Sequence, residues 1–140
     1  MLIDQGDLLW DMDHLFVKNF MAVSAKINFE GNSVIFREGD KASHFYTLIS
    51  GSVRLTTGER PKEIYIVDKA GEGFGWSSLV ERNYYSATAE SLEPTFVLQF
   101  ERNSLTDFLT KNPEHGFAFY RRLAGMLGQR LTQCYKIIHL

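Results

Sequence analysis

Residues 73–89, GFGWSSLVERNYYSATA, place glycines and short hydroxyl side chains next to a strand-like run. A loop of this kind can offer backbone N–H groups to an anion, and the start of a short helix adds a favourable dipole. Gly75, Ser77 and Ser78 are suited to such contacts. Trp76, Tyr84 and Tyr85 stand where an anion site needs charge. The segment predicts a small-ligand loop, and which anion it holds, if any, stays open.

No other group of side chains forms a catalytic pattern. A cupin-like metal site needs two histidines one residue apart, and the four histidines of the chain lack that spacing. His44 is better explained as a turn or strand-start residue. The sequence has no Ser-His-Asp order, Walker loop or paired carboxylates. We therefore predict no bound metal, no resident cofactor and no enzyme activity.

Cys134 is the single cysteine of the chain. It excludes an intrachain disulfide and leaves too few sulfurs for a structural zinc site, which fits a reducing cytoplasm. A free cysteine could be a redox sensor, but its place on an apolar helix stripe favours a small core residue. The first thirty residues lack a basic and apolar leader, and no apolar run is long enough to span a membrane. We expect a cytoplasmic protein without membrane contact.

Composition indicates one globular domain over residues 1–140. The hydrophobic content of 44% in 140 residues supplies material for a core. A formal net charge of -2 argues against a nucleic-acid-binding surface across the domain. We expect no direct nucleic-acid binding.

The apolar spacing divides the chain into helix, strands and helix. Steps of three and four predict an N-terminal helix over about 7–25. Short β-branched and aromatic runs separated by turn residues fill 32–101, among them HFYTLI, EIYIVD and YYSATA. They predict a mainly β fold, an antiparallel barrel or sandwich, because helix-length connections between the runs are absent. Helical spacing returns over 103–138, with Asn103 or Ser104 as the first N-cap and Asn112 before Pro113 as the second.

The long C-terminal helix has an apolar stripe that must be covered. The stripe comprises Tyr120, Leu123, Leu127, Leu131, Cys134 and Ile138. It could pack on the barrel of its own chain or pair with the same helix of a second chain, and the length of the helix favours a homodimer. The cations of RRLAGMLGQR, residues 121–130, are expected to be solvated.

Two phrases, GNSVIFREGDKASHFYTLISGSVRL at 31–55 and AGEGFGWSSLVERNYYSATAESLEP at 70–94, carry a family resemblance. The chain resembles cyclic-nucleotide-binding domains, as in bacterial catabolite activators, over about residues 10–138. In the first phrase, Gly39 and Gly51 suit turns with positive φ, while Ile35 and Tyr46 suit the barrel interior. The resemblance implies a jelly-roll barrel with an N-terminal helix and a long C-terminal helix.

In that family the second phrase is a phosphate-binding cassette. Its pattern is Phe-Gly-Glu followed by small residues and, later, Arg before a small residue, Ala and Thr. The Glu binds the ribose hydroxyl and the Arg binds the phosphate. The matching positions here are Gly75, Ser77, Ser78, Ser86 and Ala87, whereas Trp76 replaces the Glu and Tyr85 replaces the Arg. Losing both polar partners costs roughly 3.5 kcal/mol, or two to three orders of magnitude in affinity.

Two questions about this cassette stay open. Trp76 could fill the space of a ribose phosphate or form a platform for a flat or apolar ligand. Arg82 could supply a replacement cation or point to solvent. Only one of the two adjacent tyrosines can point inward if the segment is a strand, and the resemblance implies Tyr85. It also implies that the C-terminal helix covers the ligand base near Cys134 and Tyr135.

These observations predict a stand-alone regulatory domain that pairs through its C-terminal helix. It is expected to bind cAMP or cGMP weakly, and to bind another small ligand or a separate output protein. The chain stops where relatives would add a helix-turn-helix, so we expect no DNA-binding output domain. The alternative is a genuine cyclic-nucleotide sensor that uses replacement contacts from Arg82 and Tyr85.

Overall fold

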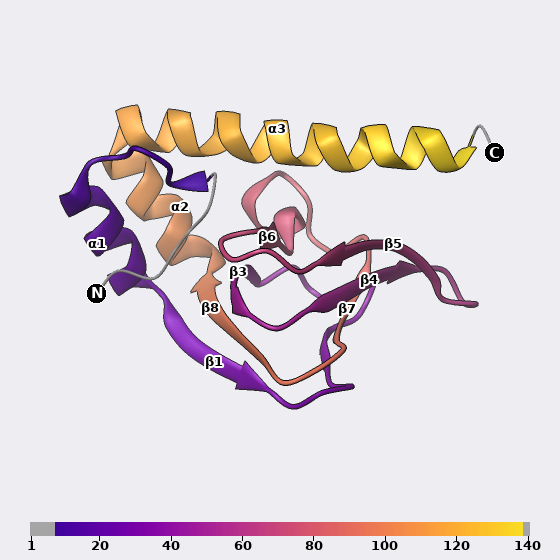
Figure 1. The fold of residues 1–140 in the computed structure, drawn as a ribbon. Coiled ribbons are helices and arrows are strands. Elements are labelled where there is room, and N and C mark those ends of the chain that lie inside the picture. Colours follow the sequence, from indigo (N-terminus) through magenta and orange to yellow (C-terminus); the bar gives the residue numbers. More distant parts are fainter. Residues whose placement is uncertain (1–7, 139–140) are drawn as a thin grey trace.

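A computed structural model describes residues 8–138, which form two facing antiparallel sheets with helices gathered on one side (Figure 1). The helices are α1 (His14–Val23), the 3-10 helix η2 (Trp76–Leu79), α2 (Arg102–Lys111) and α3 (Pro113–Ile138). The strands are β1 (Ala25–Phe29), β2 (Val34–Phe36), β3 (His44–Ser50), β4 (Val53–Thr57), β5 (Lys62–Val67), β6 (Gly73–Phe74), β7 (Thr88–Ser91) and β8 (Thr95–Glu101).

Each sheet has four strands, in the orders β1-β8-β3-β6 and β2-β7-β4-β5. All pairs are antiparallel, as expected for a jelly roll, but the two sheets do not join into a closed barrel. Inward-facing side chains alternate along the strands and fill the space between the sheets. Leu48, Val53 and Val97 are fully buried there. The mainly β fold with flanking helices is confirmed.

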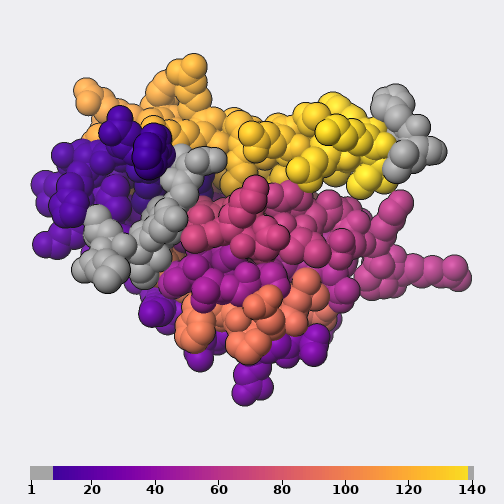
Figure 2. Space-filling model, viewed as in Figure 1, coloured from indigo at the N-terminus to yellow at the C-terminus, as the bar shows by residue number. Residues whose placement is uncertain are grey.

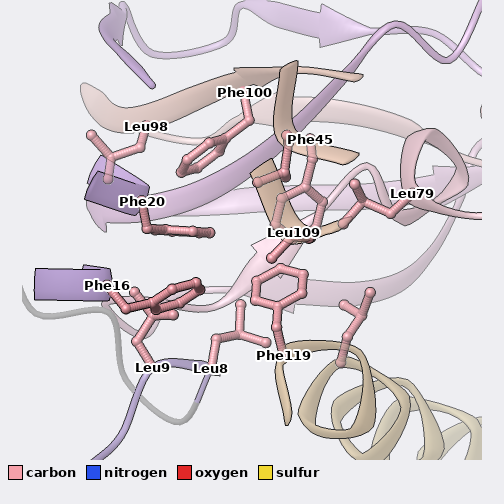
Figure 3. Packing of buried hydrophobic residues seen from close by; sticks show 12 residues of the cluster. Leu8, Leu9, Phe16, Phe20, Phe45, Leu79, Leu98, Phe100, Leu109 and Phe119 are labelled. Carbon is pink, nitrogen blue, oxygen red and sulfur yellow. The ribbon is translucent and has the colours of Figure 1, made fainter. Parts of the chain in front are cut away.

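A second core joins the helices to the first sheet (Figure 3). Phe20 of α1 lies between Phe100 of β8 and Phe119 of α3, with ring centroids 4.6 and 5.7 Å away. Phe45 of β3 also approaches the Phe119 ring, edge on. The aromatic contacts fix α1 and the start of α3 against the sheet.

The N-terminal helix is shorter than the predicted 7–25. Asp13 caps it by accepting a hydrogen bond from the Phe16 N–H at 3.2 Å, so α1 begins at His14. Position 7 lies outside the described residues. The chain leaves the helix at Ser24, and Ala25–Phe29 pairs with β8 as an edge strand. The β region therefore begins seven residues before the predicted 32, because this segment pairs with β8 over its whole length.

The two C-terminal helices lie almost where they were predicted. The N-cap of α2 is Glu101, whose carboxylate accepts from the Asn103 and Ser104 N–H groups, so neither of those residues is the cap. Pro113 begins α3, as predicted, but Asn112 is the C-cap of α2, and its side-chain amide donates to the Phe108 carbonyl oxygen at 2.8 Å. Pro suits this first position because its missing N–H would have no helical partner.

The apolar stripe of α3 has two halves. Leu123 is buried and Leu127 partly buried against the same chain, so the first half covers its own domain. In the second half Leu131 and Ile138 are 51 and 76% exposed, and the neighbouring Tyr135 is 51% exposed. The yellow end of the helix stands over the magenta segment of the sheets (Figure 2). None of the helices within residues 8–138 is long and apolar enough to cross a membrane.

Candidate functional site

The predicted cassette begins where β6 turns into η2. Gly75 has a φ of 78°, in the left-handed region that glycine adopts without strain, and a Cβ there would meet the His44 carbonyl oxygen at 3.0 Å. Its carbonyl accepts from the N–H and the hydroxyl of Ser78, at 3.1 and 2.7 Å. Ser77 and Ser78 are both buried. The glycine turn and the short helix are therefore locked to the first sheet.

Tyr85 occupies the centre of the cassette. Its hydroxyl donates to the His44 carbonyl oxygen at 2.6 Å and accepts from the His44 N–H at 3.0 Å. Its ring stacks on Phe36, with centroids 3.7 Å apart and an interplanar angle of 14°. Burial raises the pKa of Tyr85 to about 12, so the hydroxyl stays protonated at neutral pH. Both polar functions of this side chain are used inside the protein.

The aromatic stack continues behind Tyr85. Phe36 also stacks on Tyr46, which stacks on Phe74 with centroids 5.0 Å apart. The remaining cavity, bordered by Gly75, Trp76 and this stack, has a volume of about 20 Å³. A single water molecule needs roughly 10–15 Å³ by this kind of measure. The interior of the cassette is thus filled by its own side chains.

The structure shows the orientation of the two adjacent tyrosines and of Arg82. Tyr84 is 62% exposed and Tyr85 5%, so only the second tyrosine points inward. The Arg82 guanidinium lies over the Trp76 ring, 5.3 Å from its centroid, instead of inside the cassette. The predicted strand YYSATA is wrong over its first four residues, 84–87, since β7 begins at Thr88 and Tyr84 makes only an isolated bridge to Lys41.

Most of the predicted site residues lie together. Gly75, Trp76, Ser77, Tyr85, Ser86 and Ala87 border the small cavity. Ser78 lies buried directly behind them. Cys134 and Tyr135, in contrast, lie on the last turns of α3 and border neither cavity described for the protein. Their predicted closure over a ligand base therefore stays a prediction.

Arg102 is a positioning residue that the sequence did not reveal. From the first turn of α2, its guanidinium donates to the carbonyl oxygens of Val80 at 2.8 Å, Arg82 at 2.7 Å and Ala42 at 3.3 Å. It holds residues 80–83, here called the exit loop, between η2 and Tyr85. A basic residue after a strand has no sequence signature for this role, because its partners are backbone carbonyls.

The long helix α3 is hydrogen-bonded to the chain on both sides of the Gly75 turn. The Tyr120 hydroxyl donates to the Leu79 carbonyl oxygen at 3.1 Å. The Arg130 guanidinium donates to the Gly73 carbonyl oxygen at 2.6 Å. Arg130 is only 9% exposed, which corrects the expectation that the cations of this helix are all solvated. A change in the cassette therefore has two direct polar routes to α3.

The site offers binding surfaces and no recognisable reaction centre. Within residues 8–138, no cluster of three or more His, Cys, Asp or Glu side chains could hold a metal ion. His44 starts β3, as expected from its position, and its Nδ1 atom lies 2.8 Å from the Ser43 hydroxyl.

Comparison with known proteins identifies the family. Residues 26–112 match the family model described as cyclic nucleotide-binding domain, and the chain belongs to this family. An uncharacterized protein of Haemophilus influenzae is 26% identical over 117 residues, which cover 82% of this chain and 91% of the relative. The domain is thus of the cyclic nucleotide-binding, sensor type.

Solved structures share this fold. A putative cyclic nucleotide-binding protein from Geobacter metallireducens is 25% identical with a TM-score of 0.76, covering 89% of this chain and 91% of the other. The sensor domain of the transcriptional regulator DNR from Pseudomonas aeruginosa is 24% identical with a TM-score of 0.73, covering 94 and 89%. The predicted family resemblance and jelly-roll fold are confirmed.

Proposed function

We propose that this chain is a regulatory domain whose cassette no longer binds cAMP or cGMP with useful affinity. The observation that carries the proposal is the filled cassette, whose cavity of about 20 Å³ lies against the Tyr85 ring. Ligand pockets for molecules of nucleotide size occupy roughly 300 Å³ or more. A cyclic nucleotide could enter only if Tyr85 left its stack with Phe36 and broke both hydrogen bonds to His44.

The chemistry of the replaced side chains supports the same conclusion. Tyr85 is neutral at physiological pH, so it offers no positive charge to a phosphate. Its hydroxyl already donates a hydrogen bond to the His44 carbonyl oxygen. The Trp76 indole has a single N–H donor and no carboxylate acceptor for a ribose hydroxyl. The backbone turn at Gly75 remains, but the two side chains that would recognise a nucleotide are absent.

Calorimetric titration with cAMP and cGMP tests this proposal. We expect no heat of binding at micromolar ligand, because the expected loss is two to three orders of magnitude. Micromolar binding to the wild-type protein would overturn the proposal and favour the alternative, in which Arg82 leaves Trp76 to pair with the phosphate. Arg82→Ala discriminates the two cases: it abolishes binding in the alternative and changes nothing in the proposal.

The exposed end of α3 supports a homodimer. Leu131, Tyr135 and Ile138 are spaced by four and three residues and lie on one side of the helix, where this chain does not cover them. Pairing with the same helix of a second copy would bury this stripe. The partly exposed Cys134 lies within it. Regulation would then pass from the domain through the paired helices to a separate output protein.

Light scattering at tens of micromolar protein tests the dimer. Leu131→Asp places a charge in the proposed seam and is expected to give the monomer mass. Phe117→Asp is the matched control, because Phe117 is 70% exposed near the other end of α3. A monomeric wild-type protein would refute this part of the proposal.

Catalysis is not proposed, and the single cysteine supports a reducing, cytoplasmic setting.

A further inference from the structure

A second, larger cavity lies outside the cassette, between α3 and the turn that precedes β6. Its volume is about 410 Å³, within the usual range for a small-molecule site. Residues 69–72 form one wall and residues 122–133 of α3 form the other, with Tyr65 of β5 and Leu8 completing it. No residue borders both this cavity and the cassette.

Arg130 is the unusual residue of this cavity. Its side chain is 10% exposed, and its guanidinium lies 4.5 Å from the centroid of the Tyr65 ring. Nη2 donates to the Gly73 carbonyl oxygen and lies 3.5 Å from a Glu72 carboxylate oxygen. Nε and Nη1 are buried and have no hydrogen-bond partner among the described residues. A buried guanidinium with two unsatisfied nitrogens is costly, and an acceptor that reached it would relieve that cost.

The Glu72 carboxylate does not satisfy this cation fully. One of its oxygens accepts from the Tyr65 hydroxyl at 2.6 Å, and the other accepts from the Lys69 N–H at 3.0 Å. The Glu72 carboxylate therefore mainly stabilises the turn before β6. The charged side chains bordering the cavity are Lys69, Glu72, Arg122 and Arg130, so three cations face one carboxylate.

We propose that this cavity binds a small organic anion, a carboxylate or phosphate ester with an apolar or planar body. Arg130 would supply the charge-assisted hydrogen bonds, which are the stronger kind of protein hydrogen bond. Gln129 and Gln133 border the same space and can donate or accept, while Met126 and the Tyr65 ring offer apolar walls. This proposal concerns a different site from the cassette, and it does not depend on whether the cassette binds a cyclic nucleotide.

Binding there would act on the helix directly. Arg130 and Met126 belong to α3, whereas Glu72 belongs to the turn leading into Gly73 and the cassette. An anion that competes with Glu72 or Gly73 for the Arg130 guanidinium would change the contact between α3 and β6. The cavity is therefore placed to couple a ligand to the position of the exposed end of α3.

Phenyl phosphate and benzyl alcohol are suitable probes, because they share an aromatic body and differ in charge. We expect millimolar phenyl phosphate to raise the melting temperature and benzyl alcohol to have no such effect. NMR of the wild-type protein should show the phenyl phosphate shifts at amides of 69–72 and 125–133, outside the cassette. Absence of binding at millimolar probe, equal binding of the neutral probe, or shifts confined to 75–87 would overturn the proposal.

Two glycines of α3 supply a blocking variant and its control. A Cβ added at Gly125 or at Gly128 meets nothing within 4 Å, but only Gly125 borders the cavity. Gly125→Leu should fold well, since glycine is unfavourable inside a helix, and should weaken phenyl phosphate binding by about tenfold or more. Gly128→Leu should leave the affinity within about twofold. Equal affinity of Gly125→Leu and the wild type would place the binding elsewhere.

Glu72→Gln gives a test with the opposite sign. The amide keeps one acceptor oxygen, for either the Tyr65 hydroxyl or the N–H groups of the turn, and removes the negative charge that competes for Arg130. We expect severalfold tighter phenyl phosphate binding, and weaker binding to every variant at high salt. Unchanged affinity of Glu72→Gln would contradict a role for Arg130. Binding of cAMP that Gly125→Leu does not affect would instead revise the proposal for the cassette alone.

Discussion

Replacing Tyr85 by phenylalanine isolates the polar work of one atom. The ring of phenylalanine keeps the 3.7 Å stack on Phe36 and leaves no large cavity, so packing is nearly unchanged. The hydroxyl that donates to the His44 carbonyl oxygen and accepts from the His44 N–H is lost. Each buried backbone group left without a partner costs about 1–3 kcal/mol, and His44 is half-buried. We expect Tyr85→Phe to lower the free energy of unfolding by about 2 kcal/mol.

Urea denaturation at a fixed protein concentration measures this loss, because pairing of chains would make stability depend on concentration. The midpoint should fall with an unchanged slope, and the melting temperature should drop by about 6 °C. Tyr84→Phe is the matched control, since that neighbouring side chain is 62% exposed, and it should stay within about 0.5 kcal/mol of the wild type. The reasoning fails if Tyr85→Phe costs no more than Tyr84→Phe.

Three further predictions rest on single contacts. The pKa of Tyr85 rises from 10.0 to about 12 on folding, so the stabilising effect of its hydroxyl is complete below pH 10 and is lost towards pH 12. In urea denaturation, the difference in the free energy of unfolding between wild type and Tyr85→Phe should therefore narrow over that range. Arg102→Gln should speed amide hydrogen exchange in the exit loop and lower the free energy of unfolding by about 1–3 kcal/mol, because three carbonyl oxygens lose a charged donor. Unchanged exchange would contradict a positioning role for Arg102. Gly116→Ala should destabilise the protein by about 1–2 kcal/mol, since the new methyl group collides with the Leu109 carbonyl oxygen. Gly128→Ala should stabilise it, because the added methyl group meets nothing and glycine is unfavourable inside a helix. Equal melting temperatures of the two variants would refute this reasoning.

Local patterns in the sequence predicted the elements that depend on local rules. Pro113 marked the start of α3 because proline has a strong preference for the first position of a helix. The left-handed conformation of Gly39 and Gly51 was likewise predictable from their place in turns. The strand over Ala25–Phe29 was missed because only pairing with β8, seventy residues away, makes it a strand.

The candidate site divides in the same way. The cassette residues from Gly75 to Ala87 could be found because the family pattern places them in order along the chain. The role of Arg130 could not be found, since a cation between polar residues on a helix usually faces water, and its burial depends on Gly73 and Tyr65. Arg102 was missed for a related reason, because its backbone acceptors can be provided by any residue type.

The two bonds between α3 and the cassette have a mechanical consequence. Tyr120 and Arg130 are ten residues apart, or about 15 Å along a helix, and Ile138 lies about 27 Å from Tyr120. If Tyr120 is the pivot, a sideways shift of about 1 Å at Arg130 becomes a swing of about 1.8 Å at Ile138 in a straight helix. A displacement of Arg130 at the larger cavity would therefore be enlarged at the exposed apolar end of α3.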